Sequence, residues 1–381
     1  RLQVLNDTGN APDTTCCDAI KNRTSDRNSR CPKRDSPYNI NPPANTAVKN
    51  DRNFVPDSCS NFLQLADGST ALVTTVYDLT LANYGLDAAY VTKVPAHEVG
   101  QCAVNELRRY GVDTQYMVRG GDRLGIYFCE KGASQRASKV IYDRKHSAIT
   151  EYDFSQVDLN ELLEGFDWLH LSGITPALAP NCRGLIIDML KEAKKKGLTV
   201  SFDGNFRSTL WTWEEARDFC TECLPYVDVL LGIEPYHLWK DENDHSKGDW
   251  KDGVPLQPSY EEQDEVFQHF VERYPNLKCI ARHVRYAHSG SENSLKAFMW
   301  YDGHTFESKL FTFTILDRVG GGDAFASGLI YAMLHDYKPM DMLNFAVASS
   351  VIKHTIHGDA NITDDVKSIR NLADMNYDIR R

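Results

Sequence analysis

The sequence predicts an α/β protein whose mostly parallel central sheet is covered by helices on both faces and carries a small β-sheet lid. From about residue 70 onward, short apolar stretches alternate with amphipathic helical patterns, and this alternation is typical of a parallel sheet. Two further strand patterns, near 124–129 and 138–142, flank only a polar turn and therefore predict a hairpin. Because a parallel sheet binds ligands beyond the carboxyl ends of its strands, the residues that follow the strands are the first candidates for a site.

Length and composition limit the class of protein. The chain has 381 residues, of which 42% are hydrophobic and 25% charged, enough for one large α/β core or two modest domains. The formal net charge of −11 argues against nucleic acid as a main partner, because a phosphate backbone needs a basic surface. No apolar stretch approaches the roughly 20 residues of a membrane span, and the first residues lack the apolar core of a secretory signal. We therefore expect a cytoplasmic protein without a membrane partner.

Composition also divides the chain. Residues 1–70 are rich in Asn, Asp, Arg, Ser and Pro and lack a periodic apolar pattern, which predicts an extension or part of the lid. Residues 71–365 are expected to form the α/β domain, with lid strands around 117–146, and residues 366–381 a C-terminal tail. A polar stretch at 240–260 is expected on the surface.

The individual elements follow from the spacing of apolar residues. Helices are expected at 73–84, 99–110, 182–196, 213–224, 323–333 and 340–354, where apolar residues recur every three or four positions. Strands are expected in the short apolar stretches 88–93, 166–174, 198–203, 226–233 and 277–284. A hairpin at 297–306 is expected to turn at Asp302 and Gly303. Cys220 and Cys223 have metal-like spacing, but no second pair follows, so we interpret them as packing thiols of a helix.

The segment DRVGGGDAFASGLI, at 317–330, is the strongest candidate for a functional element. Its glycines, Gly320, Gly321 and Gly322, lack Cβ atoms, so the backbone can bend sharply and bring N–H groups against an anion. A helical pattern begins at Asp323, which puts the glycines at a helix N-terminus, where the macrodipole favours negative charge. The segment predicts a phosphate site with a carboxylate beside it. The alternative is a tight turn in which Asp323 is only an N-cap.

Two better-known glycine motifs do not fit this segment. A Walker P-loop would end in Gly-Lys-Ser/Thr, and the dinucleotide motif G-x-G-x-x-G would need a glycine at Phe325. A nicotinamide-dependent oxidoreductase is therefore disfavoured.

Further polar side chains follow predicted strands or lie in the predicted lid. Asp203, Asn205 and Arg207 come at the end of the strand at 198–203, with turn residues and a helix cap as the alternative role. Arg285 follows the strand at 277–284. Tyr142 and Arg144 share a face of the predicted lid, because alternate strand residues point the same way. Arginine pairs with a carboxylate in a planar, two-bonded geometry, so Arg144 with Tyr142 and Tyr127 would suit an acidic, hydroxylated small molecule; alone, an exposed strand arginine is more often just solvated.

The wording of these motifs resembles a known family. DRVGGGDAFASGLIYAML is similar to the C-terminal signature of the ribokinase-like (PfkB) carbohydrate kinases. The segments LANYGLDAAYVTK, GQCAVNELRRYGVDT and SGITPAL resemble bacterial 2-keto-3-deoxygluconate kinases, and the likeness runs in order from about Leu81 to Asp359. The resemblance implies a ribokinase-like three-layer α/β sandwich that transfers the γ-phosphate of ATP to a terminal hydroxyl of a sugar acid, with Mg²⁺ bridging the nucleotide phosphates.

The resemblance also implies roles for particular residues. Asp323 would be the general base, and the N–H groups of Gly320, Gly321 and Gly322 would form an anion hole. The sugar acid would be held by Tyr127, Tyr142, Arg144, Arg207, Asp323 and Asp359, and ATP by Asn205, Arg207, Arg285 and the glycines. It identifies no protein ligand of the metal. Lids in this family often pair between subunits, so a homo-oligomer through the lid is a further expectation.

The sequence departs from the family pattern in places. Residues 71–76 read ALVTTV where the family carries Gly-Gly-x-x-x-Asn, residues 233–236 read IEPY where it carries an acidic Asn-Glu-Glu-Asp element, and 283–286 read HVRY instead of Thr-Leu-Arg-Glu. The changes at 71–76 and 233–236 favour a rival hypothesis, a non-catalytic kinase-like scaffold, whereas the intact glycine triplet with Asp323, together with Arg207, Tyr142 and Arg144, favours an enzyme. A second rival is a sibling kinase for a neutral sugar or nucleoside, which would not need Arg144 and Arg207 to converge.

Overall fold

The computed structural model describes residues 54–56, 63–67, 75–153, 155, 157–234, 250–251, 254–255, 257–363 and 365–376. All of them fall within one compact unit, residues 47–381. Most of the segment 1–70 and of the surface insertion expected at 240–260 therefore lies outside the described residues, as do residues 71–74, where the sequence departs from the family.

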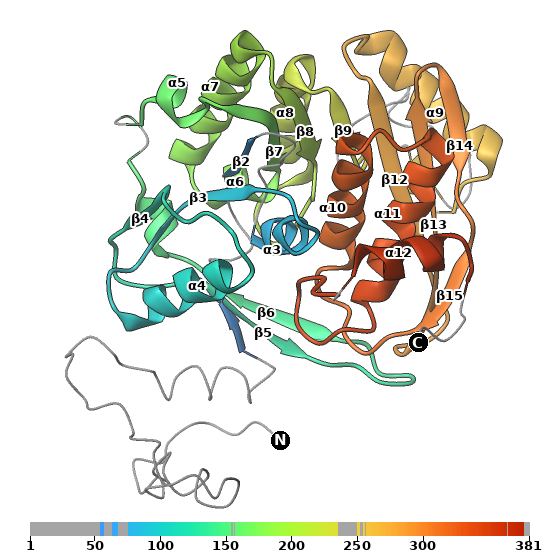
Figure 1. Cartoon of the computed structure of the whole chain (residues 1–381), viewed down its shortest axis with the longest axis horizontal. Helices are drawn as coiled ribbons and strands as arrows, with labels where there is room; N and C mark the ends of the chain where they lie inside the picture. Colours follow the sequence, from blue (N-terminus) through green and yellow to red (C-terminus); the bar gives the residue numbers. More distant parts are fainter. Residues whose placement is uncertain are drawn as a thin grey trace, which may run out of the picture. The chain divides into compact units, whose positions relative to one another are not determined.

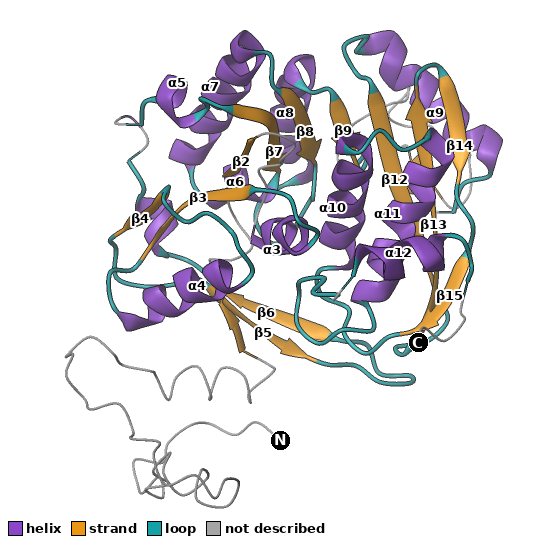
Figure 2. Ribbon diagram, viewed as in Figure 1, coloured by secondary structure: helices purple, strands orange, loops and turns teal. Residues whose placement is uncertain are grey.

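One large sheet forms the centre of the molecule (Figures 1 and 2). Its strand order is β14-β13-β12-β9-β8-β7-β2-β3-β4, and β15 also pairs with β13. The strands are β2 (Leu63–Asp67), β3 (Ala88–Val94), β4 (Met117–Arg119), β7 (Phe166–Ser172), β8 (Thr199–Asp203), β9 (Val229–Leu231), β12 (Cys279–Ala287), β13 (Glu292–Tyr301), β14 (His304–Glu307) and β15 (Phe311–Thr314). The predicted parallel sheet is confirmed in its middle, because β7, β8, β9 and β12 run parallel. Strand β2 is antiparallel to both of its neighbours, β7 and β3.

Helices cover both faces of this sheet, as the alternating pattern predicts. They are α3 (Thr75–Asn83), α4 (Glu98–Arg109), α5 (Leu159–Leu162), α6 (Ile174–Leu178), α7 (Pro180–Lys196), α8 (Trp213–Cys223), α9 (Tyr260–Arg273), α10 (Gly321–Leu334), α11 (Pro339–Lys353) and α12 (Val366–Ala373). One apolar cluster joins α7, α8 and α9 to one face, and another joins α3, α10, α11 and α12 to the opposite face. Cys220 and Cys223 are fully buried in the first cluster, which confirms that they are packing thiols.

A separate three-stranded sheet forms the lid. Strand β5 (Ile126–Glu130) pairs with β6 (Lys139–Asp143) in the predicted antiparallel hairpin, and β1 (Phe54–Pro56) pairs with the other edge of β5. Part of the segment 1–70 thus belongs to the lid, as expected, although β2 of the same segment belongs to the central sheet. A small pair, β10 (Trp250–Lys251) and β11 (Val254–Pro255), lies in the predicted insertion.

Several sequence predictions need correction. The lid does not begin at 117, because β4 (Met117–Arg119) pairs with β3 of the central sheet and Met117 packs against the same apolar cluster as Leu107. The expected C-terminal tail begins with α12, whose Ile369 is fully buried against α11. Arg285 lies within β12 rather than after it, because antiparallel pairing with β13 extends the strand to Ala287.

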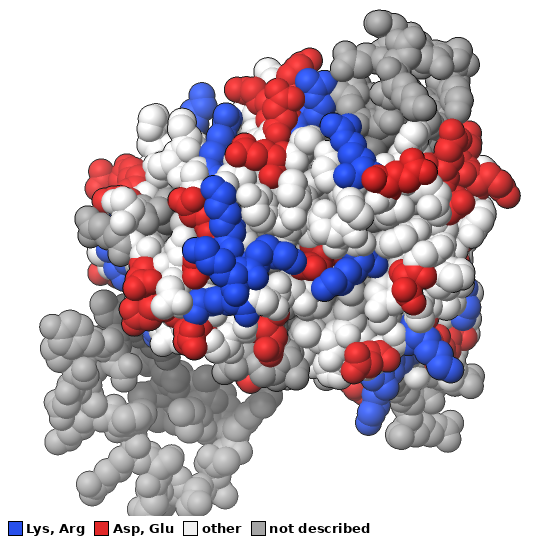
Figure 3. All heavy atoms as spheres, turned by 90° about the horizontal axis from the view of Figure 1, so that it is seen from above, with Lys and Arg blue, Asp and Glu red and all other residues white. Residues whose placement is uncertain are grey.

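Charged side chains of both signs share the surface. On the face seen in Figure 3, groups of Lys and Arg side chains have Asp and Glu beside them. Ion pairs such as Lys194–Asp228 at 2.9 Å and Lys296–Glu307 at 2.6 Å show the same mixing. The absence of a nucleic-acid partner stays a prediction. Among the described residues, no helix has the length and apolar character that a bilayer crossing requires.

Candidate active site

The predicted site residues line one cavity of about 700 Å³ between the lid and the carboxyl ends of the parallel strands. The cavity wall includes Tyr127, Tyr142, Arg144, Asn205, Arg207, Arg285, Gly320, Gly321, Gly322, Asp323 and Asp359. They come from β5, from the end of β6 and the residue after it, from the turn after β8, from β12, from the N-terminus of α10 and from the loop after α11 (Figure 1). Residues far apart in the sequence therefore meet at the edge of the sheet where such folds bind ligands.

The glycine triplet forms the start of helix α10, as the sequence predicts. Gly320 is the N-cap, with φ of 79°, and a Cβ there would lie 1.6 Å from the carbonyl oxygen of Asp359. A Cβ on Gly321 would lie 2.3 Å from Cε1 of His354. The first N–H groups of a helix have no acceptor within the helix, so this end offers them to an anion in the cavity. The two close contacts explain why glycine occupies these positions.

Asp323 lies in the first turn of α10 and forms a polar cluster with Tyr77 and Asp203. Tyr77, which is buried on α3, donates from Oη to Oδ2 of Asp203 at 2.7 Å. Burial, followed by the negative charge of Asp203, raises the pKa of Asp323 to about 6, while Tyr77, Arg207 and Lys353 partly offset this rise. Burial also raises the pKa of Asp203 and of Tyr77. Asp323 therefore titrates close to neutral pH.

The turn after β8 holds Asp203, Asn205 and Arg207 in a fixed arrangement. The N–H of Asn205, a residue with φ of 39°, donates to Oδ1 of Asp203 at 2.9 Å, and its Nδ2 donates to Oγ of Ser172 at 3.3 Å. Arg207 donates to the carbonyl oxygens of Asn205 and Phe206 at 3.4 and 3.0 Å. These residues therefore shape a turn, as the alternative role supposed, and also line the cavity.

The lid contributes an aromatic and cationic surface. The guanidinium of Arg144 lies 4.0 Å from the centre of the Tyr142 ring, and the rings of Tyr142 and Tyr127 are 6.1 Å apart. Arg144 follows β6 directly and is only 6% exposed, so it is not the solvated strand arginine of the alternative hypothesis. Its charge is held beside an aromatic face, a favourable cation–π geometry.

Strand β12 adds Arg285 and His283, alternate residues that both line the cavity. Burial and then the charges of Arg285 and Arg282 lower the pKa of His283 to about 4, so this histidine is neutral at physiological pH. Arg282 instead donates to Gln263 at 3.0 Å and to Glu234 at 3.3 Å. Glu234 lines the cavity and is the acidic residue that remains where the family carries an acidic element.

Sequence reasoning missed several residues of this site. It gave no role to Tyr77, His283 or Lys353, and it noted Asp203 without a function. Lys353 is fully buried, and burial lowers its pKa to about 8 although Asp317 and Asp359 favour the charged form. Asp359 is affected in the opposite sense, because burial raises its pKa to about 6. The only signal in the sequence was a lysine within the mostly apolar helical pattern at 340–354, and nothing in that pattern places it beside the glycine loop.

The cavity has no ready-made cage for a metal ion. Among the described residues, no group of three or more His, Cys, Asp or Glu side chains is placed to hold one. Asp203 and Glu234 nevertheless line the cavity as carboxylates. Mg²⁺ is usually bound by one or two carboxylates together with substrate phosphates, so this donor set fits a magnesium ion carried by a nucleotide.

The fold and the cavity together define a ribokinase-like α/β protein with a small β-sheet lid. Residues 79–235 match the pfkB family carbohydrate kinases. A 2-dehydro-3-deoxygalactonokinase of Haloferax volcanii is 30% identical over 298 residues, 77% of this chain and 85% of that protein. The chain therefore belongs to the PfkB family of carbohydrate kinases, which are phosphotransferases with an alcohol acceptor, and the resemblance noted in the sequence is confirmed.

Two further proteins are similar over most of the chain. The crystal structure of a 2-dehydro-3-deoxygluconokinase from Thermotoga maritima is 37% identical, covers 81% of this chain and 90% of that chain, and has a TM-score of 0.71. A 5-dehydro-2-deoxygluconokinase of Clostridium perfringens is 25% identical over 313 residues, 81% of this chain and 84% of that protein. All three names describe kinases of deoxygenated keto sugar acids.

Proposed function

We propose that this protein is an ATP-dependent sugar-acid kinase that phosphorylates a terminal hydroxyl of 2-keto-3-deoxygluconate or a close analogue. The observation that carries the proposal is that the N-terminus of α10, the carboxylate of Asp323 and the guanidinium groups of Arg144 and Arg207 all line one cavity. A transferable phosphoryl group, an acceptor hydroxyl and a substrate carboxylate are the groups that these side chains suit. The names of the similar proteins favour the same class of substrate.

In this proposal Asp323 is the general base. It removes the proton of the acceptor hydroxyl as the hydroxyl oxygen attacks the γ-phosphorus of ATP, while the bond from that phosphorus to the β,γ-bridging oxygen breaks and ADP leaves. A base works best when its pKa lies near the working pH, and the value of about 6 for Asp323 meets that requirement. The N–H groups of Gly320, Gly321 and Gly322 would donate to the oxygens of the phosphoryl group in transfer, where preorganised donors stabilise the developing charge.

The proposed substrate contacts divide by chemistry. Arg144, stacked on Tyr142, and Arg207 would bind the carboxylate of the sugar acid, while the hydroxyl of Tyr127 and the carboxylate of Asp359 would bind its hydroxyl groups. Asn205, Arg207 and Arg285 would lie at the nucleotide phosphates. When bound, Mg²⁺ neutralises charge on the nucleotide phosphates. Asp203 and Glu234 are the carboxylates of the cavity that would hold the ion, directly or through its water ligands.

We also propose that a second copy of the chain covers the outer face of the lid. Phe128 and Ile141, which are directly paired on β5 and β6, are 46% and 54% exposed. Such an apolar pair on a small sheet favours association with a partner. Sedimentation of the wild type and of a Phe128→Ser, Ile141→Ser double variant measures the oligomeric state of each, and we expect the variant to be the less associated. A monomeric wild type would contradict this part of the proposal.

A coupled assay of ADP release tests the function. The panel is 2-keto-3-deoxygluconate, 2-keto-3-deoxygalactonate, fructose, ribose and adenosine, each with ATP and Mg²⁺. Turnover of the keto acids alone supports the proposal. Turnover of a neutral sugar or of adenosine instead favours the sibling kinase, and no turnover with any acceptor favours the non-catalytic scaffold.

A further inference from the structure

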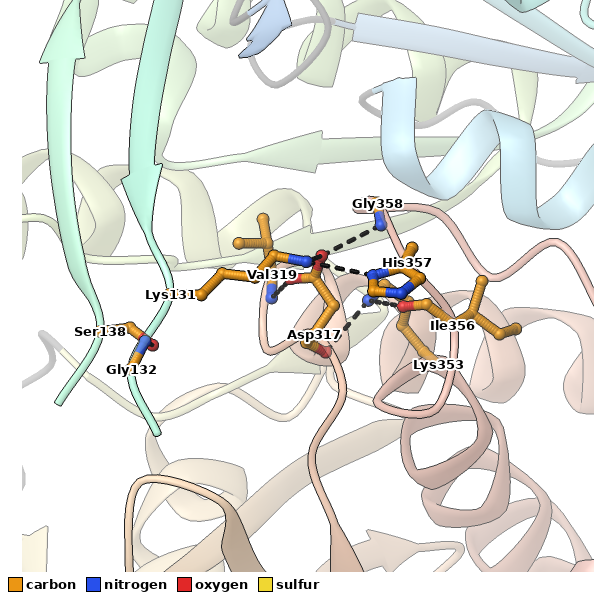
Figure 4. Close-up of polar contacts among 9 residues, drawn as sticks. All are labelled: Lys131, Gly132, Ser138, Asp317, Val319, Lys353, Ile356, His357 and Gly358. Carbon is orange, nitrogen blue, oxygen red and sulfur yellow. Dashed lines mark hydrogen bonds and ion pairs between the residues drawn. The ribbon is translucent and has the colours of Figure 1, made fainter. Parts of the chain in front are cut away.

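A buried carboxylate, Asp317, joins three parts of the chain next to the glycine triplet (Figure 4). The side chain is 5% exposed. Its Oδ1 accepts from the N–H of Val319 at 3.4 Å, and its Oδ2 accepts from the N–H of Gly358 at 3.1 Å. The same Oδ2 lies 2.7 Å from Nζ of Lys131, a residue of the lid hairpin between β5 and β6. One carboxylate thus contacts its own loop, the loop that carries Asp359, and the lid.

A second ammonium group fixes the backbone of the same loops. Nζ of Lys353 donates to the carbonyl oxygen of Asp317 at 3.3 Å and to that of Ile356 at 3.4 Å. The N–H groups of Leu316 and Asp317 both donate to the carbonyl oxygen of His354, at 2.8 and 3.1 Å. The loop before the triplet and the loop before Asp359 are therefore held as one unit. Gly320 also packs closely against the backbone of Asp359, since a Cβ at Gly320 would lie 1.6 Å from the carbonyl oxygen of Asp359.

Lys131 is positioned to influence this unit from the lid. Its Nζ also lies 3.1 Å from Nδ1 of His357, and Figure 4 shows its side chain reaching from the hairpin to Asp317 and His357. Lys131 is not among the residues that line the cavity, whereas its partner Asp317 lies directly before Arg318, which does. The hairpin has a second attachment, where the N–H of Ser134 donates to Oγ of Ser291 at 2.8 Å. Loss of the Lys131 ammonium would therefore free the loop that carries Asp317, while the Ser134–Ser291 hydrogen bond still holds the lid hairpin.

We propose that Lys131 and Asp317 are positioning residues that couple the docked lid to the shape of the glycine triplet. With the lid docked, Lys131 neutralises Asp317 and holds it against the N–H groups of Val319 and Gly358, and the triplet is set for phosphoryl transfer. With the lid away, Asp317 is a buried carboxylate that has lost its lid cation, and a charge in that situation strains its surroundings. The inference rests on the proposed kinase function, because its kinetic effect is on phosphoryl transfer.

The test compares three lid variants: one that removes the charge of Lys131, one that keeps it, and one that removes the charge of a neighbouring lysine. Lys131→Met removes the ammonium and keeps the length of the side chain, Lys131→Arg keeps the charge, and Lys139→Ala removes a neighbouring exposed lysine of the same hairpin. We expect Lys131→Met to lower kcat about ten-fold, the usual scale for a lost charged hydrogen bond, with little change in KM for ATP. Lys131→Arg should recover most of the rate, and Lys139→Ala should match the wild type.

A double variant and an amide-exchange measurement identify the route of the effect. If Lys131 acts through Asp317, the variant carrying both Lys131→Met and Asp317→Asn is no slower than Asp317→Asn alone, whereas multiplied losses would overturn the coupling. Hydrogen exchange of the amides at 319–322, measured in the free protein, should be faster in Lys131→Met than in Lys139→Ala. Equal exchange and equal kcat in these two variants would refute the inference. A wild type without turnover would refute the kinase proposal instead, and the exchange comparison would still decide this one.

Discussion

At the scale of single residues, Asp323 is the group on which the proposed chemistry depends most. Replacing it with Asn keeps the size of the side chain but removes the base. We expect kcat to fall by about 10² to 10⁴, the typical contribution of a general base. The fold should persist, because a favourable charge at a helix N-terminus is worth only about 0.3–1 kcal/mol. Steady-state kinetics and thermal unfolding of Asp323→Asn check both statements, and full activity with an unchanged melting temperature would remove Asp323 from the mechanism.

The pKa of Asp323 also predicts a pH dependence. A base with a pKa of about 6 is progressively protonated below that pH, so kcat/KM should fall about ten-fold per pH unit on the acid side. The effect of pH on the free energy of unfolding has the opposite sign. Because the folded state binds this proton more tightly than the unfolded chain, the contribution of Asp323 to the free energy of unfolding decreases as pH rises from about 4 to about 6. A profile that stays flat down to pH 5 would contradict the assignment.

Tyr77 lowers the pKa of the proposed base, against the larger effects of burial and of Asp203. Its hydroxyl donates to Asp203 at 2.7 Å, and its hydrogen bonding lowers the pKa of Asp323 as well as that of Asp203. Tyr77→Phe removes the hydroxyl and keeps the ring, so the acid limb of the kcat/KM profile should move to higher pH. Thermal unfolding separates this effect from a packing defect. An acid limb at the wild-type pH would show that Tyr77 has no part in tuning the base.

At the scale of elements, the start of helix α10 allows a matched pair of glycine substitutions. In Gly321→Ala the new Cβ would lie 2.3 Å from Cε1 of His354, so this ring, which is buried and hydrogen-bonded to the carbonyl oxygen of Ser350, must shift. We expect this overpacking to cost about 1–3 kcal/mol of unfolding free energy. In Gly322→Ala the nearest atom is Cε1 of His283 at 3.7 Å, an ordinary contact, so stability should hardly change. Chemical denaturation of the two variants measures the difference, and equal stabilities would mean that the His354 contact is not restrictive.

Elements also show what local pattern can and cannot predict. The middle strands and α10 were predictable, because continuous apolar stretches and helical spacing reflect burial directly. Strand β2 was not, since it lies in a segment without a periodic apolar pattern and its place is set by antiparallel pairing with β3 and β7. Helix α12 was taken for part of a C-terminal tail, and its Ile369 is buried in the apolar cluster that also contains residues of α10 and α11.

At the scale of the whole molecule, the candidate site could be predicted as a set because its residue types and the family motifs agree. The family motifs placed Arg144, Arg207 and Asp323 at one site, and these residues line one cavity. Tyr77, Asp203 and Lys353 could not be assigned in the same way. Their roles arise from burial and from contacts across helices, such as that of Tyr77 with Asp203, which no local pattern in the sequence records.

The shared cavity predicts how ligands stabilise the fold. Because its walls come from the lid, the central sheet and α10, a ligand bound there holds all three together. A ligand at about 100 times its Kd should add about 2.7 kcal/mol to the unfolding free energy. Thermal unfolding of Asp323→Asn with ATP, Mg²⁺ and 2-keto-3-deoxygluconate, without turnover, should show this increase, and fructose serves as the control. No shift with any ligand would argue against binding in the cavity.

The glycine triplet is synthesised after most strands of the central sheet. Strands β7, β8, β9 and β12 precede it, and Asp359 follows α11. A nascent polypeptide leaving the ribosome can therefore begin to assemble the sheet before the glycine triplet has emerged, since protein units fold during synthesis. Until Asp359 has also been translated, Gly320 lacks the backbone that it packs against. Incomplete copies therefore lack the finished wall of the cavity.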